Sequence, residues 1–275
     1  MKNFKKLLAV LLAGLMLLSL AACGGKDDVI KMGVLEATGM EGLHTGAHDE
    51  HMRMGVDDTT ECINYNNLST ALMDLESGKI KAIGLEEYTA KYVAARNENI
   101  IVGYPATNCV KTHFSMMTME NNKEVYDILN NAIKDMKADG TLESLIENEL
   151  KAYIESDPVA KDLPHFDGAK AIKIGVTGDV PPMDFVAANG KAAGFNIALL
   201  AEIANRAQVN FELVQIETGA RPIALSSNKV DAVFWTKSVT CSECNGEWAE
   251  VVEGTLVTES YFSTQTVAIA IKSDK

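Results

Sequence analysis

The chain has 275 residues, of which 47% are hydrophobic and 23% are charged, as in ordinary globular proteins. Its formal net charge of −13 argues against a nucleic-acid partner and against a basic face that binds a membrane surface. Without an amino-terminal leader, about 250 residues remain, which is enough for one two-lobed domain or two small ones.

The first 22 residues have the pattern of a secretory signal peptide. Lysines 2, 5 and 6 precede an apolar run from Leu7 to Leu20, and small residues precede Cys23. This run is too short for a comfortable membrane span. The ending "LAAC" resembles the bacterial lipobox, whose cysteine becomes the lipidated first residue, although an ordinary cleavage site is the alternative. We therefore expect lipid on Cys23, a tether over 23–28, and attachment to the extracytoplasmic face of the cell membrane by lipid alone.

Apolar runs typical of buried strands alternate with amphipathic helical patterns along the rest of the chain. Residues 124–137 carry apolar side chains at helical spacing, Asp139-Gly140 ends that helix, and Thr141 is expected to cap the next one. This alternation predicts an α/β fold with mostly parallel sheets flanked by helices. The predicted strands are 29–34, 81–85, 100–104, 171–176, 211–217, 231–235 and 266–272, and a further helix is predicted over 197–207.

Two parts of the chain follow the same local order. "VIKMGV" at 29–34 is similar to "AIKIGV" at 171–176. Residues 71–85 are similar to residues 222–235: both segments contain a helix end, a Ser-Gly or Ser-Asn turn, a lysine and a buried strand, in that order. Recurrence in register favours two related lobes. Residues 155–170 contain two prolines and no periodicity, which indicates a linker.

The motifs "GDVPPMDF", "NGKAAGF" and "NKVDAVF" in the second half resemble the first lobe of extracellular solute-binding proteins of the polar amino-acid type, which serve ABC importers. "NLSTALMDLESGKIKAIGLEEYTA" resembles the second lobe of that family, and "NNKEVYDILNNAIKDMKADGTLESLIE" resembles its closing helices. The resemblance implies a two-lobed periplasmic-binding-protein type II fold that closes on a ligand between its lobes.

The order of these pieces is reversed relative to the usual family member, as if the chain were circularly permuted at a hinge. A pair of truncated tandem domains is the less attractive alternative, because the pieces add up to about one complete copy. The expected segments are a second lobe over 29–108, a closing strand and helices of the first lobe over 109–154, a joint between the ancestral termini over 155–170, and a first lobe over 171–275.

The resemblance also places candidate ligand-binding residues. Glu86 falls where the family has the acid that holds a ligand ammonium; a solvated loop acid is the alternative. Thr38 and Gly39 lie near a turn whose N–H groups receive a carboxylate. Arg221 resembles an arginine that holds a carboxylate in some family members, with a surface arginine at the cleft rim as the alternative.

Residues 236–248 depart from the family pattern. Thr240 keeps its place, but Glu243 stands where the family has the arginine that clamps the ligand's α-carboxylate. A carboxylate does not bind a carboxylate, so an α-amino acid ligand requires Arg221 or Lys237 to take over that role. Phe185 and Trp235 are candidates for the aromatic ring that stacks on the ligand, although Trp235 could equally belong to the core.

Histidines and cysteines suggest a weaker alternative. His44, His48 and His51 would share one face of a helix and could bind a metal ion, or belong to a solvated polar stretch. After Cys23, the remaining cysteines have no readable pairing: Cys62, Cys109, Cys241 and Cys244.

We therefore expect a monomeric, non-enzymatic, lipid-anchored binding protein without a cofactor, which passes a small polar, amino-acid-like solute to ABC permease subunits. Two alternatives remain at this stage. One is a metal-binding or sensing lipoprotein that uses the three histidines, and the other is a dehydratase-like enzyme on the same fold, with Glu86 and Glu243 as acid and base.

Overall fold

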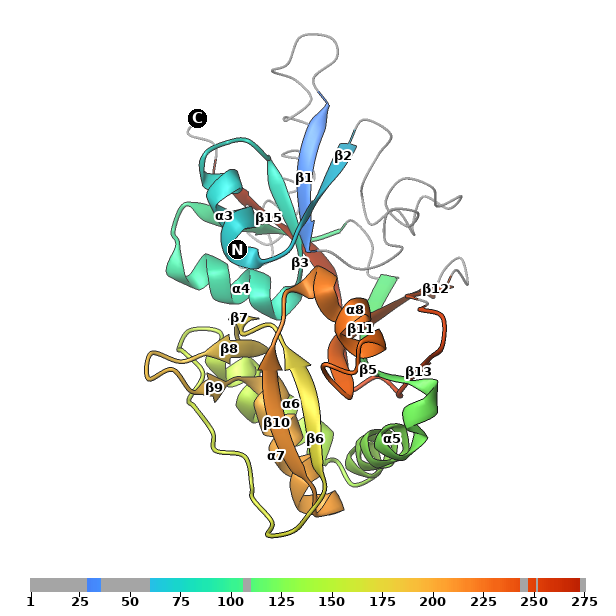
Figure 1. The fold of residues 1–275 in the computed structure, drawn as a ribbon. Coiled ribbons are helices and arrows are strands. Elements are labelled where there is room, and N and C mark those ends of the chain that lie inside the picture. The colour runs from blue at the N-terminus through green and yellow to red at the C-terminus, as the bar shows by residue number, and fades with distance from the viewer. Residues whose placement is uncertain (1–28, 36–59, 106–109, 243–246, 251, 273–275) are drawn as a thin grey trace.

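The computed structural model describes residues 29–35, 60–105, 110–242, 247–250 and 252–272 (Figure 1). They form two lobes, each built on its own mixed sheet with helices packed against it. We name them the five-stranded lobe and the seven-stranded lobe. The predicted α/β class with sheets flanked by helices is confirmed.

The five-stranded lobe has the strand order β2-β1-β3-β15-β4. β1 pairs in parallel with β2 and β3, whereas β15 runs antiparallel between β3 and β4. α3 and α4 pack apolar side chains, among them Leu75 and Val93, against Ile83 and Ile269 of the sheet. The bounds are β1 Ile30–Leu35, β2 Thr60–Tyr65, α3 Leu68–Glu76, β3 Ala82–Glu86, α4 Glu87–Arg96, β4 Ile100–Gly103 and β15 Thr266–Ile271.

The seven-stranded lobe repeats this plan with the order β10-β6-β11-β5-β13, to which β12 and β14 are added at the sides. β6 pairs in parallel with β10 and β11, and β5 is antiparallel to β11. The bounds are β5 Val110–Met119, β6 Ala171–Val176, β10 Asn210–Gln215, β11 Ala232–Cys241, β12 Glu247–Ala249, β13 Thr255–Val257 and β14 Phe262–Thr264. A small sheet beside it contains β7 Asp179–Val180, β8 Asp184–Val186 and β9 Ala192–Ala193.

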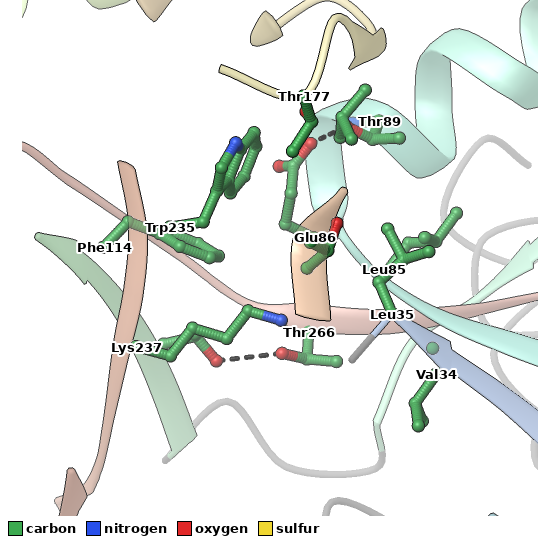
Figure 2. Close-up of a pocket in the computed structure, with 14 residues that line it drawn as sticks. Val34, Leu35, Leu85, Glu86, Thr89, Phe114, Thr177, Trp235, Lys237 and Thr266 are labelled. Atoms are coloured by element: carbon green, nitrogen blue, oxygen red, sulfur yellow. Dashed lines mark hydrogen bonds between the residues drawn. The ribbon is translucent and has the colours of Figure 1, made fainter. Parts of the chain in front are cut away.

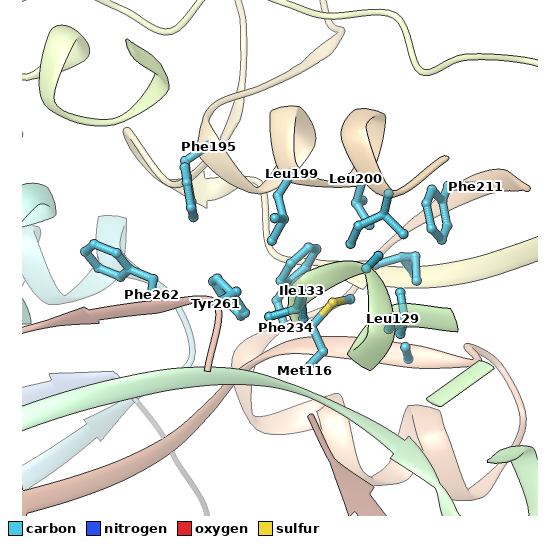
Figure 3. Close-up of a cluster of buried hydrophobic side chains, with 14 of the residues drawn as sticks. Met116, Leu129, Ile133, Phe195, Leu199, Leu200, Phe211, Phe234, Tyr261 and Phe262 are labelled. Carbon is cyan, nitrogen blue, oxygen red and sulfur yellow. The ribbon is translucent and has the colours of Figure 1, made fainter. Parts of the chain in front are cut away.

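Three helices share one core with the seven-stranded sheet (Figure 3). α5 Lys123–Ala138, α6 Thr141–Glu149 and α7 Phe195–Ala207 contribute to a cluster that includes Leu129, Leu199 and Phe234. α8 Arg221–Ser226 packs Leu225 into a separate cluster with Val233. The predicted stripe over 124–137 is thus the buried face of α5, whose Val125, Leu129, Ile133 and Met136 are buried.

The two echoed segments occupy equivalent places. "VIKMGV" forms β1, which lies between its parallel partners β2 and β3. "AIKIGV" forms β6, which lies between its parallel partners β10 and β11. Each also contains a glycine in close contact with an isoleucine: a Cβ on Gly33 would lie 2.8 Å from Ile80 Cδ1, and one on Gly175 would lie 2.6 Å from Ile216 Cδ1. The echo therefore reflects a common packing plan.

Two details differ from the predictions. Thr141 does not cap α6; it is the first residue of that helix, and its N–H donates to Asp139 Oδ1 at 2.9 Å. Residues 266–271, placed by sequence in the 171–275 segment, form β15 in the sheet of the five-stranded lobe. The chain passes between the lobes from β4 to β5 and from β14 to β15.

Gly194 should be the less replaceable of two glycines that both have positive φ. Its φ is +99°, and a Cβ would lie 2.6 Å from Pro182 O and 2.8 Å from Met183 O, whereas Gly190, with φ +77°, has nothing within 4 Å. We expect Gly190→Ala to lower the free energy of unfolding by about 1–2 kcal/mol through backbone strain alone, and Gly194→Ala by roughly 1–3 kcal/mol more. Urea unfolding of both variants measures the difference, and equal losses would contradict the close contact.

Candidate functional site

A cavity lies between the lobes, beside the strands that connect them (Figure 2). The five-stranded lobe lines it with the ends of β1 and β3, the seven-stranded lobe with β11 and the segments after β6 and β10, and the connection with β5 and β15. Ligands of open α/β sheets bind at the carboxyl ends of parallel strands. The position of the cavity therefore makes it the candidate binding site.

Glu86 is an acid at the top of this cavity. It is the last residue of β3 and the N-cap of α4, and its carboxylate accepts the N–H groups of Tyr88, at 2.8 Å, and Thr89. Burial raises the pKa of the Glu86 carboxyl, and these donors oppose that rise. The amino-terminal end of a helix favours negative charge, so the fold holds this carboxylate in place at the cavity wall (Figure 2).

Lys237 reaches the cavity from β11 (Figure 2). Burial lowers the pKa of its ammonium to about 8; the charge of Arg221 also lowers it, while Glu250 and Glu86 raise it. Among the described residues, no hydrogen bond or ion pair engages Lys237 Nζ. The cavity thus carries an acid from one lobe and a cation from the other.

Trp235 also lines the cavity from β11, and its ring meets Phe114 edge-on with centroids 5.4 Å apart. Its φ is +71°, and the pairing of β11 with β5 is irregular between Val233 and Thr236. A bulky residue in the left-handed region costs roughly 1–3 kcal/mol and persists only where surrounding contacts impose it. The irregularity directs an aromatic ring to the cavity wall.

Arg221 lies behind β11 and contacts the backbone next to Trp235. Its guanidinium donates from Nε to Thr218 O at 2.9 Å and from Nη1 to Phe234 O at 3.2 Å, and Nη2 lies 3.4 Å from Glu250 Oε1. Glu250 Oε2 in turn accepts the Lys237 N–H at 3.2 Å. Arg221 is 3% exposed and is not among the residues that line the cavity. Its position therefore matches neither the ligand contact nor the surface arginine considered from sequence.

The other sequence candidates are scattered. Phe185 borders a second groove, between α3, α4 and the small sheet, and Thr240 is hydrogen-bonded to His113 Nε2 at 2.9 Å. Neither lines the cavity. Seven residues lie outside the described part of the chain: Cys23, Thr38, Gly39, His44, His48, His51 and Glu243. Of the cysteines, Cys62 is a free thiol, Cys241 is buried on β11, and Cys109 and Cys244 lie outside the described residues.

Sequence reasoning missed the hydroxyl groups of the cavity. Thr112 of β5 and Thr266 of β15 have their Oγ1 atoms 2.8 Å apart, and Thr177 and Thr218 line the cavity from the seven-stranded lobe. Thr177 directly follows the buried strand "AIKIGV", which is a signal that could have been read. Thr112 and Thr266 gave none, because their proximity depends on the pairing of segments far apart in the chain.

Direct contacts join the lobes around the cavity. Leu68 N–H, at the start of α3, donates to Asp179 Oδ2 at 3.0 Å, and Thr218 N–H donates to Asn66 O at 3.4 Å. Elsewhere, Asp157 Oδ1 accepts Tyr92 Oη at 2.5 Å and Arg96 Nη2 at 2.9 Å. The volume of the cavity that the centres of water molecules can occupy is about 60 Å³. This is enough for a few waters, which need ~10–15 Å³ each. The lobes are therefore close together in this structure.

Residues 172–273 match the sequence model of a protein family, the bacterial extracellular solute-binding proteins, family 3. This stretch covers β6 to β15 and contains Arg221, Trp235 and Lys237, so the resemblance predicted for the second half is confirmed there. The match includes 102 of the 275 residues, less than half of the chain. A comparison with curated proteins gives no match.

Solved structures with a similar fold have low identity. A ligand-binding component of an ABC-type import system from Staphylococcus aureus, with zinc bound, is 13% identical over 89% of this chain and 66% of its own, with a TM-score of 0.39. The GluR0 ligand-binding core with L-glutamate is 11% identical over 91% of this chain and 87% of its own, with a TM-score of 0.39. The substrate-binding protein of an amino acid ABC transporter is 11% identical over 90% of this chain and 87% of its own, with a TM-score of 0.38. TM-scores this low carry no functional conclusion.

Two further findings concern the described residues alone. None of their helices is long and apolar enough to cross a membrane. They also contain no group of three or more histidine, cysteine, aspartate or glutamate side chains placed to hold a metal ion. The three histidines of 44–51 lie outside this part of the chain, so the metal hypothesis stays a prediction.

The Arg221–Glu250 pair should matter to stability as a unit. Loss of one partner of a buried ion pair leaves an uncompensated charge and costs roughly 3–5 kcal/mol, whereas apolar replacement of both is often close to neutral. We expect Arg221→Met to destabilise the protein by about that amount and the double variant Arg221→Met/Glu250→Leu to recover much of the loss. Urea unfolding in a double-mutant cycle measures this, and additive losses would mean that the two side chains are not coupled.

Proposed function

We propose that this protein is an extracytoplasmic solute-binding protein, held at the cell membrane by lipid on Cys23. It captures a small polar, amino-acid-like solute between its lobes and delivers it to the permease subunits of an ABC importer. The match of residues 172–273 to an extracellular solute-binding family supports the general class. The observation that carries the proposal is the cavity between the lobes, with Glu86 on one wall and Lys237 on the other.

The lining of the cavity is suited to a small zwitterion. A carboxylate and an ammonium are displayed from opposite lobes, threonine side chains also line the cavity, and Phe114 and Trp235 offer apolar surface. Ligand pockets combine apolar walls with a few polar groups that fix orientation. Because the charges come from different lobes, a solute with both charges would contact both lobes and favour their closure.

Hinge opening is the motion that admits the solute. The strands that flank the two crossings between the lobes are paired, because β5 pairs with β14 in one lobe and β4 pairs with β15 in the other. The remaining interlobe hydrogen bonds, such as those to Asp157 and Asp179, join separate elements and can break without disturbing either sheet. Hinges consist of a few loop or strand-end residues that absorb the backbone rotation of domain closure, and the ends of these four strands are the candidates.

Circular permutation accounts for the order of the lobes. The five-stranded lobe comes first in the chain, and the segment that matches the family model comes last. We propose that residues 155–170 join what were once separate termini at the surface, where such rearrangements are tolerated.

A thermal-shift screen tests the ligand class. A solute that binds only the folded state raises stability by RT ln(1 + [L]/Kd), about 2.7 kcal/mol at a hundredfold excess over Kd. We expect amino acids to raise the Tm of the protein and divalent metals or uncharged sugars to leave it unchanged. If only metals raised the Tm, the amino-acid proposal would be wrong and the histidine alternative favoured.

Glu86→Gln should weaken binding of an amine-bearing solute. Loss of a charge-assisted hydrogen bond costs roughly 1.5–3 kcal/mol of binding free energy, which calorimetry measures. Glu86 also caps α4, so the hydroxy-acid analogue of the same solute serves as the matched ligand: its affinity should change much less. Glu87→Gln, next to it on α4 and ion-paired with Lys91, is the matched variant. An equal loss for amine and hydroxy acid would assign Glu86 to the helix cap alone.

A further inference from the structure

Lys237 is placed to recognise an anion, whereas Arg221, the other cation predicted for that role, already binds protein groups. Arg221 is buried behind β11 in contact with Glu250 and two backbone carbonyls. Lys237 extends into the cavity (Figure 2), and no hydrogen bond or ion pair of its Nζ exists among the residues that the structure describes.

We propose that Lys237 binds the carboxylate of the solute, so that the cleft selects carboxylate-bearing ligands and releases them as pH rises. This inference rests on the proposed function for its binding site. It assigns carboxylate recognition to Lys237 of β11, because Arg221, the other cation considered for that role, is buried and paired with Glu250.

The nearby carboxylates leave Lys237 available because each is engaged elsewhere. Glu86 accepts two N–H groups at the start of α4. Glu250 is shared between the guanidinium of Arg221 and the backbone N–H of Lys237. A solute carboxylate would supply a direct partner for the ammonium of this half-buried side chain.

The charge of Lys237 depends on pH in an accessible range. The groups that act on it are Arg221, whose charge lowers its pKa, and Glu250 and Glu86, which raise it; burial is the largest influence, and the resulting pKa is about 8. Below this pH the ammonium is charged and attracts a carboxylate. Each pH unit above it reduces the charged fraction about tenfold, and the affinity for a carboxylate should fall in proportion.

Lys237 should also make the empty protein less stable. Its pKa is about 8 in the folded state against an ordinary 10.5, so between these values the unfolded chain binds more protons and the free energy of unfolding rises with pH. At neutral pH the folded state bears a desolvated charge. We therefore expect Lys237→Met to raise the Tm of the empty protein, by roughly 2–4 °C or more, while it abolishes carboxylate binding. A merely structural lysine would do neither.

The direct test follows the lysine side chains by NMR with ¹³C at Cε, with acetate as the probe. Lys237 is assigned from Lys237→Arg, and Lys229, outside the cavity, is the internal control. We expect acetate, exchanged for chloride at constant ionic strength, to shift the Lys237 signal saturably at pH 7, to raise the pKa of Lys237, and to lose this effect at pH 10. The Lys229 signal should not respond. Equal responses of the two lysines, or none, would overturn the inference.

A thermal-shift series on wild type, Lys237→Met and Lys237→Arg separates this inference from the proposed function. The inference predicts that amino acids raise the Tm of wild type and Lys237→Arg, and that Lys237→Met loses this response. If Lys237→Met responded like wild type, the proposed function would stand and Lys237 would have no role in it. If no amino acid raised any Tm while acetate still shifted Lys237, the amino-acid proposal would fail and the carboxylate site would stand.

Discussion

The buried contact between Arg221 and Glu250 controls the wall of the cleft. It joins α8, β11 and the segment after β12. It binds the carbonyl of Phe234, inside the irregular stretch of β11, and the N–H of Lys237, just after it. The backbone of Trp235, with φ +71°, lies between these two contacts. A salt bridge of this kind contributes little net stability; what it provides is a defined position for the side chains that line the cavity.

The fold was largely predictable because its strands are short, apolar and bounded by turns. "AIKIGV" and "VIKMGV" are the central strands β6 and β1, and the stripe of 124–137 is α5. β2 was not predicted, because residues 60–65 are mostly half-buried at a sheet edge and lack an apolar run. The place of residues 266–271 was also not predictable, since only long-range pairing assigns a strand to one sheet or the other.

Three of the ligand-binding candidates that the sequence named line the cavity: Glu86, Trp235 and Lys237. Glu86 follows the predicted strand 81–85 by one residue and Trp235 ends the predicted strand 231–235, whereas Lys237 was named only through the family resemblance. The place of Arg221 was not predicted, because its role depends on Glu250 from a different part of the chain. The threonine hydroxyls were missed for the same reason: Thr112 and Thr266 come together through two strands that no local pattern links.

The position of β15 affects the order in which the protein can fold as it is synthesised. β15 separates β3 from β4, with Thr266 opposite Glu86 and Ile271 opposite Ile100. The lobe that is synthesised first therefore lacks an interior strand of its sheet until the last part of the chain is made. Contacts of such high sequence separation form slowly, and the gap exposes two unpaired strand edges in the meantime.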